Sequence, residues 1–365
     1  MEIRPLLQKM LEKNASDLHI RAKDHAYIRV DGVLHPADER IFTPEETLSL
    51  AKSLMNDEQD KTFRARHEVD LAYTFEGLGR FRINVYSNLG IVNMVLRVVP
   101  VDIPTMEQLK LPPVIQKIAD NRRGLVLVTG TTGCGKSTTL ASMINYINGA
   151  RTAHIVTIED PIEYIHKELK SIISQRELGF DTLSYPDALR NVVRQDPNVI
   201  LLGEMRDLDT MAAAITAAQT GHLVLSTVHT VDAAQSVNRI LDMFPPHQQT
   251  QMRFLLADTL KAVISQRLLP HSSGSGRVPA VEVMVVTALV KKMIEDNNIS
   301  EITNLMKQGQ YYGMQTFNQA LIKLFQTGEV KLEDALAAAA NPEELMLSIR
   351  GIQSSSEDAS SIFDR

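Results

Sequence analysis

The spacing of apolar residues predicts a small α+β domain in the first hundred residues. Apolar side chains recur every three or four positions at Ile3, Leu6, Leu7, Met10 and Leu11, which is typical of a helix. A second helix is expected at 44–55, and Asp31-Gly32 is typical of a tight hairpin turn. Strands, in which apolar and polar residues alternate, are expected at 17–20, 27–30, 69–75, 79–86 and 91–99.

From Val114 onward the pattern changes to helices separated by short runs of consecutive apolar residues. These runs lie at 125–129, 154–159, 199–203 and 222–227. A strand that is apolar on both faces is typical of a parallel sheet covered by helices on both sides, so we predict an α/β fold. Beyond about residue 286 only helical spacing continues, on Leu289, Met293 and Ile294, then over 317–325 and 335–340.

Prolines and composition divide the chain. Pro100, Pro104, Pro112 and Pro113 indicate a linker between the two patterns. The Ser- and Gly-rich run 272–276 is expected to be a flexible loop. The predicted segments are an N-terminal domain at 1–99, a linker at 100–112, a nucleotide domain at 113–285, a helical region at 286–350 and a disordered polar tail at 351–365.

A phosphate-binding loop is the strongest chemical signal. Residues Gly130 to Ser137 complete the pattern G-x-x-x-x-G-K-S between a buried strand and a helix. In this motif glycines let backbone N–H groups surround phosphate, the lysine reaches the terminal phosphates, and the hydroxyl binds magnesium. We therefore expect bound ATP or GTP with Mg²⁺. The predicted contacts are Thr132, Gly133, Cys134, Gly135, Lys136, Ser137 and Thr138.

Cys134 within this loop permits two interpretations. A thiol beside phosphate-facing amides could have a lowered pKa and respond to oxidation. The interpretation that we favour is a small side chain at a variable position of the motif.

Acidic residues follow two of the apolar runs. Glu163 lies in the acidic segment 158–164, and we expect it to orient or deprotonate the attacking water; the alternative is an acidic surface turn at Pro161. Glu204 follows Gly203, where many phosphate-loop proteins carry an aspartate, so we expect Glu204 to serve the magnesium ion, through a bound water.

Histidines and arginines supply further candidates. His222 and His229 border one apolar run; hydrogen-bonded structural histidines are the simpler interpretation, and His229 is the better candidate for sensing a γ-phosphate. Arg80, Arg82 and Arg97 lie on predicted N-terminal strands. They are either solvated charges or phosphate contacts.

Bulk properties exclude several classes of protein. The chain has 365 residues, a net charge of −6 and one cysteine. A single cysteine rules out a disulfide framework and a four-cysteine zinc site. The acidic balance argues against a nucleic-acid surface, and no apolar run has the length of a membrane span. We expect a cytoplasmic protein that meets membranes only through partners.

The motifs together resemble the secretion ATPase superfamily, and most of all the type IV pilus retraction ATPases PilT and PilU. The resemblance covers about residues 1 to 350. It rests on four ordered motifs beside the segment 15–19: the loop 130–137, the segment 158–164, the run from Arg194 to Asp207, and the run from Thr220 to Thr230.

This resemblance implies a PAS-like N-terminal domain, a RecA-like ATPase domain and a homohexameric ring. It implies ATP and Mg²⁺ as cofactors, with Lys136 on phosphate and Ser137 on magnesium. By motif, Glu163 would be the catalytic acid, Glu204 the Walker B acid and His229 the residue near the γ-phosphate. Arg82 and Arg97, with Arg80 as a third, match the family's phosphate-contacting arginines.

The implied partners are an inner-membrane platform protein at the base of the pilus and a paralogous retraction ATPase. The implied function is pilus retraction in twitching motility. The segment 288–295 matches the PilT pattern A-I-R-N-L-I-R-E only loosely, with Val290 in place of the first arginine, so PilT-like and accessory PilU-like roles both stay open. A related secretion or assembly ATPase and a RecA-like nucleic-acid motor are further alternatives.

Overall fold

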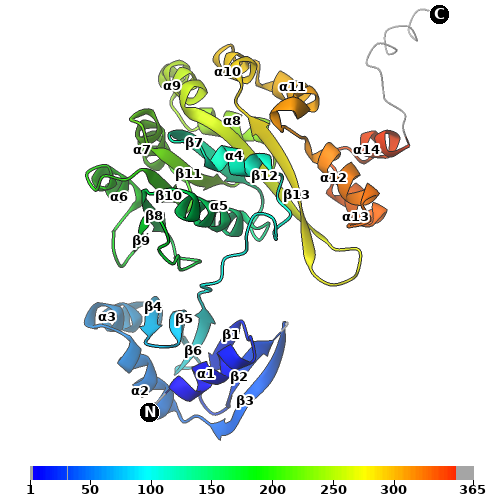
Figure 1. Cartoon of the computed structure of the whole chain (residues 1–365). Coiled ribbons are helices and arrows are strands. Elements are labelled where there is room, and N and C mark those ends of the chain that lie inside the picture. Colours follow the sequence, from blue (N-terminus) through cyan, green and yellow to red (C-terminus); the bar gives the residue numbers. More distant parts are fainter. Residues whose placement is uncertain (1–2, 31, 351–365) are drawn as a thin grey trace, which may run out of the picture. The chain divides into compact units, whose positions relative to one another are not determined.

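The computed structural model describes residues 3–30 and 32–350, and within them the chain forms two compact units (Figure 1). Unit 1 runs to Asp102 and includes Glu163–Ile165; unit 2 comprises Ile103–Ile162 and the chain from His166 onward. The division falls in the predicted linker, and Met106 and Leu111 are buried in the core of unit 2. The finer domain boundaries stay predictions, and the tail 351–365 lies outside the described residues.

Unit 1 is the predicted α+β domain, built on a six-stranded antiparallel sheet of order β3-β2-β1-β6-β5-β4. Alternation places Leu18, Phe81 and Leu96 in its core and leaves polar residues on the opposite face. Its elements are α1 (Arg4–Glu12), β1 (Asp17–Ile20), β2 (His25–Val30), β3 (Val33–Ile41), α2 (Pro44–Leu54), α3 (Asp57–Arg66), β4 (Glu68–Phe75), β5 (Gly79–Asn88) and β6 (Ile91–Val98).

Two elements of unit 1 were not predicted. Helix α3 buries only Phe63, so it has almost no apolar periodicity; a reciprocal capping box between Asn56 and Gln59 begins it instead. Strand β3 is largely exposed and pairs with β2 as a hairpin in which Val30 faces Val33. This confirms the predicted hairpin, although Asp31 of its turn lies outside the described residues.

Unit 2 confirms the predicted α/β fold and its helical C-terminal region. Its seven-stranded sheet has the order β13-β12-β7-β11-β10-β8-β9. The elements are α4 (Val114–Ala119), β7 (Gly124–Thr129), α5 (Lys136–Ala150), β8 (His154–Glu159), β9 (Ile172–Glu177), α6 (Tyr185–Val192), β10 (Val199–Leu202), α7 (Leu208–Gln219), β11 (Leu223–Val228), α8 (Ala233–Asp242), α9 (Pro246–Thr259), β12 (Leu260–Pro270), β13 (Arg277–Val285), α10 (Ala288–Glu295), η1 (Ile299–Glu301), α11 (Ile302–Gln308), η2 (Gly309–Tyr312), α12 (Phe317–Gln326), α13 (Leu332–Ala338) and α14 (Pro342–Ile349).

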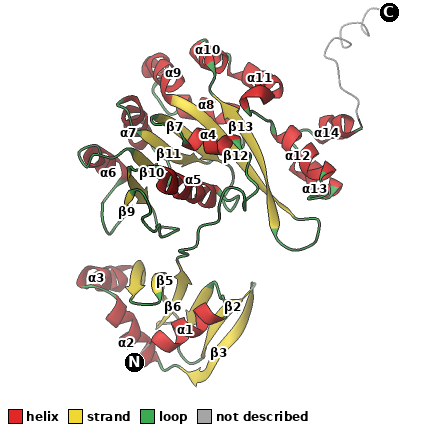
Figure 2. Cartoon of the chain, viewed as in Figure 1, coloured by secondary structure: helices red, strands yellow, loops and turns green. Residues whose placement is uncertain are grey.

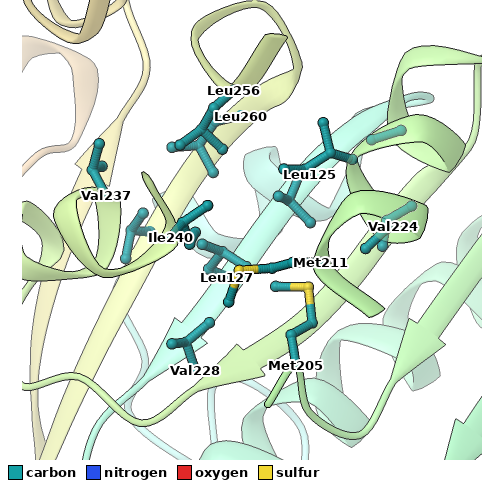
Figure 3. Close-up of a cluster of buried hydrophobic side chains, with 14 of the residues drawn as sticks. Leu125, Leu127, Met205, Met211, Val224, Val228, Val237, Ile240, Leu256 and Leu260 are labelled. Carbon is teal, nitrogen blue, oxygen red and sulfur yellow. The ribbon is translucent and has the colours of Figure 1, made fainter. Parts of the chain in front are cut away.

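Apolar cores cover both faces of this sheet, which explains the unbroken apolar runs. Along β7, Leu125 and Leu127 point into one core and Val126 and Val128 into the other. Figure 3 shows the first core, where Leu125 and Leu127 lie among side chains of other strands and helices. Strand β7 lies inside the sheet, paired with β11 and β12 and buried on both faces, so the loop that follows it has a well-packed base.

The predicted sheet was incomplete at both edges. Strand β9 was not predicted, and neither was the long hairpin of β12 and β13 (Figure 2). Strand β13 runs antiparallel to β12, so the sheet is mixed rather than wholly parallel. The run 272–276, predicted as a flexible loop inside the nucleotide domain, connects these two strands.

Helix positions in the C-terminal region also differ in detail. Leu289, predicted on the apolar face of its helix, is exposed, and Val290 is buried instead. Helix α13 (Leu332–Ala338) ends before Ala339, whose backbone is extended, so the predicted 335–340 helix begins three residues late and ends two residues late. No helix in the described ranges is long and apolar enough to cross a membrane.

Candidate active site

The glycines of the loop 130–137 are required by its geometry. Gly130 has φ of +138°, and a Cβ there would lie 2.5 Å from the carbonyl oxygen of Gln266 and 2.6 Å from Sγ of Cys134. Gly135 precedes α5 with φ of +94° and offers no side chain to cap it. The first N–H groups of α5 are therefore left for an anion, as in other phosphate-binding loops.

Lys136 is held across this loop. Its Nζ donates to the carbonyl oxygens of Gly130 at 2.8 Å and Thr131 at 3.0 Å, and the residue is buried. Burial lowers the pKa of the Lys136 amino group, and the negative charge of Glu204 opposes that shift. Glu204 thus lies within electrostatic reach of the loop lysine.

Cys134 lies inward, under the loop. It is buried, and burial raises the pKa of its thiol. The redox interpretation requires a lowered pKa, which burial opposes, so the simpler interpretation, a small packed side chain, fits better.

We expect Cys134 to react slowly with thiol reagents. Because the chain has one cysteine, labelling with an aromatic disulfide reagent at pH 7 reports this position alone. The folded protein should label about 100-fold more slowly than protein in denaturant, since only the exposed thiolate attacks. Equal labelling rates in the two states would contradict the burial of Cys134.

Glu204 forms the centre of a polar cluster beyond β10. Arg206 Nε lies 2.7 Å from one carboxylate oxygen and His229 Nε2 lies 3.4 Å from the other. Because β10 and β11 are parallel neighbours, with Leu202 opposite Ser226, Glu204 and His229 emerge at the same edge of the sheet. Of the predicted residues in unit 2, the structure brings Lys136, Glu204 and His229 into one group.

Packing explains why a glycine precedes Glu204. A Cβ on Gly203 would lie 2.8 Å from the hydroxyl oxygen of Tyr185. Met205, the residue after Glu204, points into the core beside Leu127 and Met211, as Figure 3 shows. The space that the aspartate of other phosphate-loop proteins would need is occupied, and Glu204 is directed away from the core.

The other predicted acid, Glu163, follows strand β8 and is placed differently. Strand β8 itself ends at Glu159, whose carboxylate accepts a hydrogen bond from Thr157 Oγ1 at 2.7 Å. Glu163 groups with unit 1. Two residues further along, the backbone N–H of Ile165 donates a hydrogen bond to the carbonyl of Pro100 at 3.1 Å within that unit. The predicted role of Glu163 in activating water stays a prediction.

His222 has a structural role. It precedes β11, its Nδ1 lies 2.9 Å from the carbonyl oxygen of Ala217, and its own carbonyl accepts a hydrogen bond from Gly124 N. It lies at the amino end of the strand, whereas His229 lies beyond the carboxyl end. The simpler interpretation therefore holds for His222.

Unit 1 carries a row of charges across the polar face of its sheet. Strand register places Arg29, Asp17, Arg97 and Arg82 opposite one another in succession, and Arg80 lies two positions from Arg82 on the same face. Arg97 Nε donates to the buried carboxylate of Asp17 at 2.7 Å. Burial raises the pKa of that carboxyl, but hydrogen bonds from Ser16 and Arg97 outweigh it and the net shift is downward.

A cavity beside the loop was not predicted. It has a volume of about 250 Å³ and is lined by Gly135 and Thr138 together with Leu268, Arg277 and Pro279 of the β12–β13 hairpin. Its size and mixed lining suit a small ring system held by apolar contacts. Nothing in the local sequence identified these residues, because the hairpin reaches the loop only through the sheet. A larger cavity of about 690 Å³, between α4 and α12, includes no residue of the loop.

Comparisons with known proteins support the motif-based resemblance. A family model described as "Type II/IV secretion system protein" matches residues 1–337. The chain belongs to this family. Within it, the protein is a type IV pilus ATPase of the PilT/PilU group.

Two relatives come from Pseudomonas aeruginosa. The type IV pilus ATPase PilU is 42% identical over 363 residues, which cover 99% of this chain and 95% of PilU. The type IV pilus retraction ATPase PilT is 40% identical over 343 residues, which cover 94% of this chain and 99% of PilT.

A crystal structure of the pilus retraction motor PilT with bound ADP has 44% identity and a TM-score of 0.89. The match covers 95% of this chain and 99% of that one. The predicted fold and the stated resemblance are thus confirmed. The similar identities to PilT and PilU leave the choice between these two roles open.

Proposed function

We propose that this pilus ATPase hydrolyses ATP and uses the released energy to retract type IV pili. The observation that carries the proposal is the grouping of a complete phosphate-binding loop with Glu204 and His229 at one edge of the sheet. Phosphoryl transfer requires mainly positioning and charge stabilisation, which such a grouping supplies. The cavity lined by Leu268 and Pro279 would hold the adenine ring.

The proposed roles follow the chemistry of each side chain. Lys136 would contact the terminal phosphates, His229 would sense the γ-phosphate through Glu204, and Glu163 would orient the attacking water. Arg97 and Arg82 would bind phosphate, with Arg80 beside them. Asp17 accepts a hydrogen bond from Nε of Arg97, so a phosphate would be bound by the two terminal nitrogens of that guanidinium group.

The available oxygen ligands fit Mg²⁺. Ser137 has an exposed hydroxyl at the start of α5, and Glu204 offers a carboxylate. Magnesium prefers hard oxygen ligands and commonly combines one or two protein oxygens with phosphate oxygens and water. When bound there, the ion would neutralise charge on the phosphates. The described residues contain no group of three His, Cys, Asp or Glu side chains suited to a metal.

We further propose that the working form is a homohexameric ring at the cytoplasmic base of the pilus machine. There it would act on an inner-membrane platform protein, and a paralogous retraction ATPase would be a second partner. A second candidate function, an accessory PilU-like ATPase, is favoured by the 42% identity to PilU over 99% of the chain.

Deletion of the gene is expected to leave cells with abundant pili and no twitching. Pili are counted by electron microscopy and twitching zones are measured on the same cultures. Restoration by the wild-type gene but not by Lys136→Ala would tie the phenotype to ATP turnover. Near-normal twitching would instead support the accessory role, and cells without pili would contradict retraction.

A further inference from the structure

Glu282 is a buried acid that no motif singles out. It lies on β13, is 6% exposed, and accepts two backbone hydrogen bonds from different helices. One carboxylate oxygen accepts from Ala233 N, the first residue of α8, at 2.9 Å. The other accepts from Phe317 N, the first residue of α12, at 3.3 Å. A single side chain thus anchors the start of two helices.

The charges around Glu282 favour its ionised form from several directions. The N-termini of α8 and α12 both carry partial positive charge, and Arg267 on β12 adds a full one. Asp232, the N-cap of α8, opposes them. Arg267 also stacks on the Phe317 ring at 4.1 Å and donates to the carbonyl of Ala338, so it extends the same cluster into the C-terminal helices.

On the α8 side, this cluster lies close in sequence to His229 of the candidate active site. His229, which lies 3.4 Å from Glu204, is four residues before Ala233 in the chain. The short segment between them is held rigidly: Thr230 and Ser236 share a hydrogen bond of 2.6 Å, and Ser236 Oγ donates to the carbonyl of Asp232. A displacement at the start of α8 would therefore be transmitted to His229.

On the α12 side, Phe317 belongs to a separate apolar core. Thr316 and Gln319 form a capping box at the start of α12. The buried residues of this core include Phe317, Leu321, Ala335 and Leu345, which belong to α12, α13 and α14. The C-terminal helices are therefore packed against the first turn of α12 and against β12 and β13 in one core.

We propose that Glu282 is a positioning residue for ATP hydrolysis, which couples the His229 segment to the C-terminal helices by holding both helix starts on one strand. It acts through backbone N–H groups and contacts neither nucleotide nor Glu204. The inference rests on the proposed ATPase function. It assigns to the C-terminal region a mechanical link with the active site.

Protonation provides a readout that simple structural support would not give. Burial raises the pKa of the Glu282 carboxyl to about 7, and the N–H groups of Ala233 and Phe317 with Arg267 oppose that rise. Above this pH both oxygens accept hydrogen bonds. As the pH falls through about 7, one oxygen gains a proton and loses acceptor strength, so turnover should fall.

The decisive test is steady-state ATPase of full-length Glu282→Gln between pH 6 and pH 9. We expect kcat to fall about tenfold, the loss of one hydrogen bond to a charged group, with KM for ATP within about twofold. The fall in turnover below pH 7 that we expect for the wild type should be absent from this variant. Ile118→Ala, which removes a buried side chain of α4 from a different core of unit 2, is the matched destabilised control and should keep both kcat and the pH profile.

Glu282→Asp provides a second variant if the glutamine variant does not fold. Its shorter side chain keeps the charge but cannot reach both helices, so kcat should fall while the pH dependence is retained. A kcat within about twofold of wild type in either variant, or an equal loss of kcat in Ile118→Ala, would overturn the inference. If turnover depends on Lys136 but not on Glu282, the proposed function stands and the coupling role falls.

Discussion

Replacing Lys136 with alanine is expected to reduce ATP turnover by at least about 10³-fold, because it removes the positive charge that stabilises the terminal phosphates. In the structure this amino group donates to the carbonyls of Gly130 and Thr131, so it is held within the loop that binds phosphate. Burial has already removed much of its hydration, which strengthens its attraction for phosphate. Turnover is measured by phosphate release at saturating ATP.

Lys117→Ala is the matched control, because Lys117 lies in the last turn of α4 in the same unit. It should retain wild-type turnover. Thermal unfolding without nucleotide separates loss of chemistry from loss of folding, since Lys136 also bonds the loop carbonyls. Turnover within tenfold of wild type in a folded Lys136→Ala protein would refute the assignment of the site.

Replacing Glu204 with glutamine is expected to lower kcat by about 10²-fold or more, while nucleotide still binds. The change keeps the shape of the side chain but removes the negative charge that pairs with Arg206 and His229 and that would attract the proposed magnesium ion. ATP binding, followed with a fluorescent analogue, should weaken far less than turnover, because the loop itself is intact.

Glu333→Gln tests whether any loss of negative charge has this effect. Glu333 is exposed in the first turn of α13, and its replacement should leave kcat unchanged. If Glu204→Gln kept full turnover, Glu204 could not be the acid that serves the reaction. If ATP binding weakened while kcat at saturating ATP stayed unchanged, Glu204 would contribute to binding only and not to the chemical step.

The parts of the fold that were predicted share a strong local signal. Strand β7, the loop and α5 were predicted because a fully apolar run, three glycines and a lysine stand next to one another in sequence. The elements that were missed lack such a signal. Helix α3 begins with a capping box and buries almost nothing, and β13 is identified only by its antiparallel pairing with β12.

The candidate site divides in the same way. Lys136 and Ser137 are adjacent in the motif, so their phosphate and magnesium roles could be predicted directly. The pairing of Glu204 with His229 depends on neighbouring parallel strands, and the cavity depends on a hairpin that joins the sheet beside β7. Glu163 was predicted to activate water because it lies in an acidic segment after β8. In the structure it groups with unit 1, and its role in activating water stays a prediction.

The phosphate-binding loop, the two folding patterns and the ordered motifs of a pilus ATPase could be predicted from the chain, because contiguous residues encode them and their conformations and chemistry are local. The burial of Cys134, the hydrogen bond between Asp17 and Arg97 and the link that Glu282 makes between α8 and α12 arise only in the tertiary fold. Asp17, Arg97 and Glu282 lie on strands, so a change of one residue in register would point each of these side chains to the opposite face. Cys134 lies in the loop between β7 and α5 and is buried by the segments that pack around that loop.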